Sequence, residues 1–236
     1  MPIEALLFDK DGTLIDFDAT FGPATFKVIE TLAQQDEKIM LAMANAAEFD
    51  LNSTAITRSS FLLAGSLEDI GKGWFDWAQE NEALSDFVAR IDNLYVRYSL
   101  ETVAPFEFLG TTLKNLAQRG LLLGVGTNDS EAGAKAHLEK INAIQQFQFV
   151  AGYDSGHGAK PAPGMVLAFA DSVGVPIESV AMVGDTLHDC MAGRAAGAIT
   201  IGVTSGQTAP EVLRPFADYI LDDISQIPAL LDSFGE

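Results

Sequence analysis

Two carboxylates stand two residues apart near the start of the chain, in the segment 9–14 (DKDGTL). The apolar run 5–8 before them predicts a strand, and side chains two residues apart in extended chain point to the same side. Asp9 could therefore attack phosphorus while Asp11 moves protons, which is phosphoryl transfer through an aspartyl intermediate. A polar turn that caps a helix is the structural alternative, because Asp-Gly pairs mark turns in many proteins.

Three further polar segments occur later in the chain. They are Thr127 and Asn128 after the apolar run 121–126, Lys160 in a proline-flanked loop, and Asp185 and Asp189 after the apolar run 180–183. In order and spacing, the four segments resemble the motifs of the haloacid dehalogenase superfamily: Asp-x-Asp, a Thr or Ser, a Lys, and a paired-Asp segment. The resemblance covers residues 1–15 and about 100–236, and it is strongest to phosphoglycolate-phosphatase-like members with a helical cap.

The pattern of apolar segments predicts an α/β fold. Strands are expected at 4–8, 121–126, 147–151, 180–183 and 199–203, and helices near 107–119, 129–142, 163–173 and 186–196. This alternation is typical of a parallel sheet with crossover helices. The resemblance implies that residues 1–15 and 99–236 form a Rossmann-like catalytic core around this sheet. Gly120, Gly174 and Gly197 follow three of these helices, where a left-handed residue commonly ends a helix. The carboxyl ends of the strands form one crevice, so the motifs can converge there.

The segment 16–98 has helical spacing of apolar residues and no convincing strand, which predicts an inserted α-helical subdomain. The resemblance implies that this subdomain is a cap that closes over the active site and selects the substrate. Candidate substrate contacts in the cap are the aromatic cluster Trp74, Phe75 and Trp77 and the basic residues Arg58, Arg90 and Arg97. Packing between helices and solvated helix faces are the alternative roles for these side chains.

The side chains of the motifs suit the steps of phosphoryl transfer. We predict that Asp9 is the nucleophile, because a carboxylate oxygen can displace an alcohol and form an acyl phosphate that water later cleaves. Asp11 would protonate the departing alkoxide and then deprotonate the attacking water. Lys160 would supply a positive charge to the nucleophile and the phosphate.

Several polar residues near the motifs have more than one possible role. Thr127 could bind a phosphoryl oxygen, with Asn128 and the following backbone amides nearby, or it could cap the helix that begins near Ser130. Lys10 could alter the surface charge beside the site, or it could form an ion pair outside the site. His157, in the loop before Lys160, is a possible substrate contact or an ordinary surface histidine.

The clustered carboxylates predict a metal site. Two like charges 4 Å apart repel by about 4 kcal/mol at an effective dielectric near 20, and a cation removes this repulsion. Oxygen-only ligands and a phosphate substrate favour Mg²⁺. The resemblance implies that Asp9, the backbone carbonyl of Asp11 and Asp185 bind Mg²⁺ directly, while Asp189 acts through a water or by orienting Lys160. The alternative for Asp189 is the ordinary negative charge of a helix N-terminus.

Composition and charge narrow the class of protein. The formal charge of −19 over 236 residues argues against a nucleic-acid partner, because phosphate backbones bind basic residues. No apolar stretch approaches the ~20 residues that span a bilayer, and the acidic N-terminal segment is unlike a signal peptide. The single cysteine, Cys190, fits a reducing compartment and the role of a small core residue. We therefore expect a cytoplasmic protein without a membrane partner, and make no prediction of its oligomeric state.

The function predicted from these features is Mg²⁺-dependent hydrolysis of a small phosphorylated metabolite, phosphoglycolate-like or a sugar phosphate. A sugar phosphomutase is the first alternative, since such enzymes share the core and both aspartates but return the phosphoryl group to the substrate. A non-catalytic binding protein on the same core is the second alternative, and the complete set of motif residues argues against it. A dehalogenase is disfavoured, because dehalogenases of the family need no Mg²⁺ and lack an aspartate equivalent to Asp11.

Overall fold

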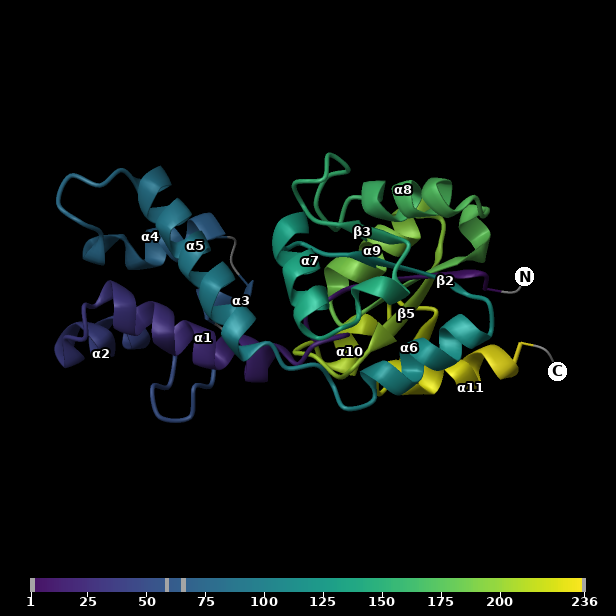
Figure 1. Cartoon of the computed structure of the whole chain (residues 1–236), viewed down its shortest axis with the longest axis horizontal. Helices are drawn as coiled ribbons and strands as arrows, with labels where there is room; N and C mark the ends of the chain where they lie inside the picture. Colours follow the sequence, from purple (N-terminus) through teal and green to yellow (C-terminus); the bar gives the residue numbers. More distant parts are fainter. Residues whose placement is uncertain (1–2, 58–59, 65–66, 235–236) are drawn as a thin grey trace. The chain divides into compact units, whose positions relative to one another are not determined.

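The computed structural model describes residues 3–57, 60–64 and 67–234. The chain divides into two compact units (Figure 1). Met1–Asp16 and Ala104–Glu236 form an α/β unit, and Phe17–Val103 form a helical unit. The insertion predicted at 16–98 differs from the helical unit at its C-terminal end, because helix α5 (Leu84–Thr102) continues past that limit.

A parallel six-stranded sheet forms the centre of the α/β unit, with the strand order β3-β2-β1-β4-β5-β6. The strands are β1 (Ala5–Phe8), β2 (Leu122–Gly126), β3 (Phe149–Ala151), β4 (Val180–Gly184), β5 (Ile199–Val203) and β6 (Tyr219–Leu221). The predicted α/β fold and its five predicted strands are confirmed. Strand β6 was not predicted, because this three-residue edge strand has no buried residue and so short and exposed a segment has no strand-like apolar run.

Helices cover both faces of this sheet. They are α6 (Leu109–Gln118), α7 (Glu131–Lys140), α8 (Gly164–Val173), α9 (Leu187–Ala196), α10 (Pro210–Leu213) and α11 (Ile227–Asp232), with 3-10 turns η2 (Ile144–Gln146), η3 (Ile177–Ser179) and η4 (Ile224–Gln226). Ala5 and Leu7 of β1 pack with buried residues of α8 and α9, so the alternate side chains Leu6 and Phe8 face the opposite side of the sheet. Figure 1 shows α6 and α11 side by side.

Glycines end three of the four predicted helices, as expected. Gly174 and Gly197 are the C-caps of α8 and α9, with φ angles of +71° and +84°, and Gly120 follows α6 with φ +80°. This left-handed conformation is accessible to glycine without steric cost. Within the described ranges, no helix is both long and apolar enough for a membrane crossing.

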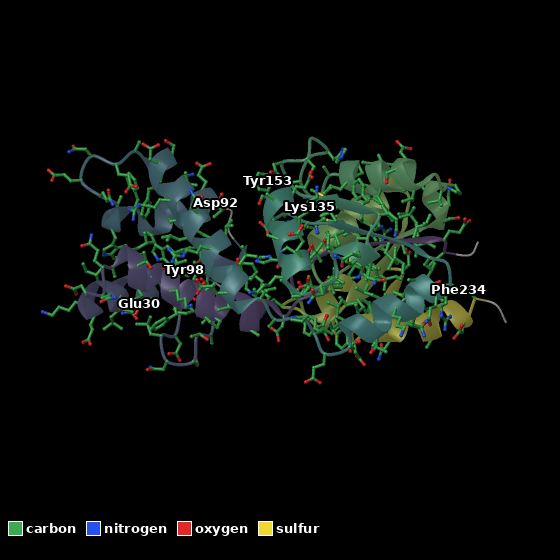
Figure 2. The ribbon with its side chains drawn as sticks, in the orientation of Figure 1. Glu30, Asp92, Tyr98, Lys135, Tyr153 and Phe234 are labelled. Carbon is green, nitrogen blue, oxygen red and sulfur yellow. The ribbon has the colours of Figure 1, made fainter. Side chains whose placement is uncertain are left out.

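The helical unit consists of α1 (Phe17–Leu32), α2 (Glu37–Ala46), α3 (Phe61–Ala64), α4 (Leu67–Trp74), the 3-10 turn η1 (Phe75–Trp77) and α5. Hydroxyl pairs link α1 to α5: the Thr25 and Tyr95 oxygens are 3.1 Å apart, and the Thr31 and Tyr98 oxygens are 2.8 Å apart. Figure 2 shows Tyr98 within this unit. Buried apolar residues from all these helices form a separate hydrophobic core, so the unit has its own packing.

The candidate substrate contacts of the helical unit have structural partners. Trp74 is fully buried, and its indole Nε1 donates a hydrogen bond to the Met43 carbonyl (3.1 Å), so its role is packing. Arg90 donates two hydrogen bonds to the Glu82 carboxylate, at 2.9 Å and 2.7 Å. Arg97 is exposed and its guanidinium lies over the Tyr98 ring. Arg58 lies outside the described residues. The partly buried Trp77 packs on the core, whereas Phe75 is 38% exposed.

Candidate active site

Two predicted catalytic carboxylates follow adjacent central strands of the sheet. Asp9 comes directly after β1 and Asp185 directly after β4, and the register pairs Phe8 with Val183. The Asp9 amide also donates to the Val183 carbonyl at 2.8 Å. From β1 the chain adds β2 and β3 on one side of the sheet, and it then adds β4, β5 and β6 on the other side. The boundary between β1 and β4 is therefore the topological switch point, where parallel α/β sheets open a ligand crevice. The sheet itself therefore brings Asp9 and Asp185 together.

Lys160 joins the nucleophile candidate to the last motif. Its Nζ lies 2.6 Å from Asp9 Oδ1 and 2.6 Å from Asp189 Oδ1, and all three side chains are buried. Burial works against the Lys160 charge, but the carboxylates of Asp189 and Asp9 outweigh it and raise the pKa of the lysine. Lys160 is therefore a cation at neutral pH, in contact with the candidate nucleophile.

Asp189 combines two of the roles considered for it. Its Oδ2 accepts hydrogen bonds from the Thr186 amide (2.9 Å) and hydroxyl (2.6 Å) in a capping box at the start of α9. Its Oδ1 meets the Lys160 ammonium as an ion pair, without a hydrogen bond of good geometry. The carboxylate thus stabilises the helix N-terminus and orients Lys160.

The second motif contacts the Lys160 loop through Asn128. The Asn128 side chain donates to the Lys160 carbonyl (2.9 Å) and accepts from the Lys160 amide (2.8 Å), so it fixes the backbone of the lysine. Thr127 is buried at the end of β2, and its hydroxyl oxygen accepts a hydrogen bond from the Asp129 amide (3.1 Å). The alternative role of Thr127 as a helix cap is wrong, because Ser130 is the N-cap of α7.

Asp9, Asp185 and Asp189 form a cluster suited to a metal ion. One carboxylate oxygen from each lies within 4.8 Å of the others, and all three residues are buried. Burial and mutual repulsion raise the pKa of Asp9 to about 7 and that of Asp185 to about 8. A cation supplies the charge that lets such carboxylates ionise, and an all-oxygen donor set fits a hard divalent ion. These residues therefore fit the predicted metal site.

A loop after β5 that was not predicted as part of the site holds Asp185 in place. The Gln207 amide donates to Asp185 Oδ2 (3.2 Å), and the Ser205 hydroxyl donates to the Gly12 carbonyl (2.7 Å). A Cβ atom added to Gly206 would lie 1.9 Å from Asp185 Oδ2, so only glycine fits against the carboxylate. The sequence signal for this loop was its position directly after the predicted strand 199–203.

Asp11, the candidate acid and base, faces Lys10. The Lys10 Nζ lies 2.6 Å from Asp11 Oδ1, and the Asp11 side chain is 21% exposed. Burial raises the pKa of Asp11, while the Lys10 charge opposes this rise. The prediction that Lys10 only alters surface charge is wrong, because this side chain is fully buried and forms ion pairs with Asp11 of the motif itself and with Asp129.

His157 and Cys190, which were also considered from the sequence, have ordinary structural surroundings. His157 is exposed in its loop and packs against Phe149, with the ring centroids 6.1 Å apart. Cys190 is buried on α9, and burial together with Asp189 raises the pKa of its thiol to about 12. A thiol with so high a pKa is un-ionised at neutral pH, which agrees with a packing role.

Comparisons with known proteins identify the family of the chain. The family model of haloacid dehalogenase-like hydrolases matches residues 3–197. The phosphoglycolate phosphatase of Escherichia coli K12 is 28% identical over 241 residues, which cover 99% of this chain and 90% of the relative. A haloacid dehalogenase-like hydrolase of Streptococcus pneumoniae superposes with a TM-score of 0.69 at 18% identity, covering 97% and 98% of the two chains. A Thermotoga maritima protein assigned as a β-phosphoglucomutase superposes with a TM-score of 0.71 at 17% identity, covering 98% of this chain and 99% of the other. The chain therefore belongs to the haloacid dehalogenase-like hydrolases.

Proposed function

We propose that this protein is a Mg²⁺-dependent phosphatase that hydrolyses a small phosphorylated metabolite through an aspartyl-phosphate at Asp9. The observation that carries this proposal is the position of Asp9, which is buried beside Asp185 and ion-paired to Lys160 at 2.6 Å. A relative that is 28% identical over nearly the whole chain is named a phosphoglycolate phosphatase, which supports a substrate of that kind. The substrate class is therefore a small phosphate monoester.

In the first step, an Asp9 carboxylate oxygen attacks phosphorus and the bond to the leaving oxygen breaks. Asp11 donates a proton to the departing alkoxide. The Lys160 ammonium and the Thr127 hydroxyl bind phosphoryl oxygens, and Asn128 keeps Lys160 in place through its two backbone hydrogen bonds. The products of this step are the free alcohol and the Asp9 acyl phosphate.

In the second step, Asp11 removes a proton from water, which attacks the acyl phosphate and regenerates Asp9 with release of inorganic phosphate. A Mg²⁺ ion, when bound by Asp9, the Asp11 carbonyl and Asp185, would neutralise charge on the phosphoryl oxygens. Asp189 supports the site by orienting Lys160 at 2.6 Å. Asp185 is kept in place by the Gln207 amide.

The helical unit Phe17–Val103 is the proposed cap that selects the substrate. It is inserted in the chain directly after the first motif, between Asp16 and Ala104, and it has a hydrophobic core of its own. A unit with its own core can move as a body on two chain crossings, admit substrate and then exclude water. We therefore assign substrate choice to this unit and phosphoryl transfer to the α/β unit.

A panel of phosphorylated metabolites, including phosphoglycolate and sugar phosphates, tests the proposal. The purified protein should release inorganic phosphate from at least one of them with Mg²⁺ and without a bisphosphate activator. The Asp9→Asn variant, prepared in the same way, is the control for contaminating phosphatases. Isomerisation of a sugar phosphate that depends on a bisphosphate, without net phosphate release, would instead identify a phosphomutase. Absence of both activities would support the binding-protein alternative.

A further inference from the structure

Lys10 is a charged side chain in the interior of the protein, next to the proposed acid. It is fully buried, although it lies between two motif residues in a polar turn. Burying a charged group without partners costs several kcal/mol, so such a lysine has to be paired and hydrogen-bonded. The partners of Lys10 therefore indicate what the residue does.

Acceptor atoms of Asp11, Asp129 and His137 lie close to the Lys10 ammonium. Its Nζ lies 2.6 Å from Asp11 Oδ1, 3.1 Å from Asp129 Oδ2 and 3.1 Å from His137 Nδ1. An ammonium group has hydrogens to donate and no lone pair, so His137 Nδ1 must accept in this contact. Burial and the Lys10 charge lower the pKa of His137 to about 4, which agrees with a neutral, accepting ring.

These contacts join the turn after β1 to the residue before the N-cap of α7 and to the last turn of that helix. Asp129 is two residues after Thr127, and its Oδ1 also accepts a hydrogen bond from the Ser130 amide (2.7 Å). His137 is buried on α7 itself. Lys10 is thus held by Asp129, directly after the second motif, and by His137 on the following helix, and it also contacts Asp11 in the first motif.

This arrangement restricts the Asp11 side chain. The Lys10 ammonium engages Oδ1, and the carboxyl then presents its second oxygen, Oδ2, in a defined direction. Proton transfer to a leaving group requires close approach and alignment, and a displacement of 1 Å can cost about 10²-fold in rate. A fixed orientation of Asp11 therefore matters most for substrates whose leaving group needs a proton.

We propose that Lys10 is a positioning residue which, anchored by Asp129 and His137, holds the Asp11 carboxyl in the orientation that proton transfer to the leaving oxygen requires. The inference rests on the proposed phosphatase function. It assigns to Lys10 a role in the step where the bond to the leaving oxygen breaks. Alkyl phosphates, which release a basic alkoxide, depend on this role more than aryl phosphates do.

The test compares two substrates in the wild type and in Lys10→Met. We expect kcat/KM for an alkyl phosphate to fall about 10–100-fold, while kcat/KM for p-nitrophenyl phosphate falls about threefold or less. Asp129→Asn, which loosens the anchor, should show the same selective loss to a smaller extent. Lys135→Met is the matched control, because Lys135 (Figure 2) pairs with Glu131 on the same helix but is 47% exposed. We expect its substrate ratio to equal that of the wild type.

A double-mutant comparison separates positioning from general damage. In an Asp11→Asn background there is no acid to orient, so Lys10→Met should add no further leaving-group-dependent loss. The Mg²⁺-dependent rise in melting temperature should persist in Lys10→Met, because the carboxylates of the metal cluster remain. Equal losses on both esters, additive losses in the double variant, or a lost Mg²⁺ response would each overturn the proposal.

The test of the proposed function and the test of the role of Lys10 have separate readouts. Phosphate release by the wild type decides the proposed function, and the substrate ratio of the variants decides the role of Lys10. If Lys10→Met does not fold, Asp129→Asn and the double variant Lys10→Met/Asp129→Asn, which removes one charge of each sign, are measured in the same way. Failure of all of them to fold would assign the cluster to stability alone and overturn the proposal as well.

Discussion

Lys160 Nζ and Asp9 Oδ1 are 2.6 Å apart, although 151 residues separate them in the chain. The same ammonium reaches Asp189 Oδ1 at 2.6 Å, so one lysine connects the first and the last motif. A cation between two buried carboxylates offsets part of their repulsion before any substrate binds.

Replacing Asp9 by asparagine should abolish turnover and leave the fold intact. The amide is nearly isosteric with the carboxylate but is a poor nucleophile, so no acyl phosphate can form. Phosphate release and circular dichroism of the variant provide the measurement. Substantial activity in a folded Asp9→Asn preparation, free of contaminating phosphatases, would remove Asp9 from the nucleophile role.

Gly206→Ala should weaken metal binding without a large change in the metal-free protein's fold. The added Cβ would lie 1.9 Å from Asp185 Oδ2 and must displace that carboxylate. We expect at least a tenfold loss of Mg²⁺ affinity. The affinity is measured from the melting temperature as a function of Mg²⁺ concentration. Gly110→Ala on α6 is the matched control, because its Cβ meets nothing within 4 Å and alanine favours a helix by up to about 1 kcal/mol. Equal Mg²⁺ responses in the two variants would contradict the close fit.

The Mg²⁺ response should depend strongly on pH. The folded protein raises the pKa of Asp9 from 3.8 to about 7 and that of Asp185 to about 8. The folded state therefore holds these protons more tightly than the unfolded chain. Without metal, these two groups should lower the free energy of unfolding as the pH rises from about 4 to about 8.

Mg²⁺ must displace these protons, so its affinity should fall at least about tenfold per pH unit below about 7. Melting curves with EDTA and with Mg²⁺ at about pH 5.5 and about pH 8 provide the measurement. At 100 times the dissociation constant, bound Mg²⁺ should add about 2.7 kcal/mol at the higher pH. An equal Mg²⁺-dependent rise in melting temperature at both pH values would contradict the raised pKa of the two carboxyls.

Exchange of the helical unit should change the substrate ranking. A chimera in which residues 17–103 come from a relative of different specificity keeps the α/β unit and its carboxylates. We expect its kcat/KM ranking over a metabolite panel to follow the donor, with shifts of roughly 1–3 kcal/mol for each changed contact. Activity on p-nitrophenyl phosphate controls for an intact α/β unit. An unchanged ranking in an active chimera would place specificity in the α/β unit.

The convergence of Asp9 and Asp185 could be predicted because it follows from a general rule. Both residues come directly after apolar runs that form buried strands, and parallel strands place such positions along one edge of the sheet. The left-handed glycines at 174 and 197 were predictable for a similar reason, since their role depends on local backbone geometry. Local pattern was sufficient in these places.

The environment of Lys10 could not be predicted in the same way. A lysine in a polar turn is normally exposed, and its burial here depends on Asp129 and His137, which lie far along the chain. The contact of Gln207 with Asp185 likewise depends on how the loop after β5 folds back. These features are set by tertiary contacts that no local pattern encodes.

The pairing of β1 has a consequence for how the protein folds. The neighbours of this strand in the sheet are β2 and β4, which the chain supplies only from residues 122 and 180 onward. Pairings between such distant segments form slowly, because the intervening chain must be closed into a loop first. The helices of Phe17–Val103 contact one another within a shorter stretch. During refolding from denaturant, helical circular dichroism should therefore return before enzymatic activity, whose recovery depends on β4 joining β1.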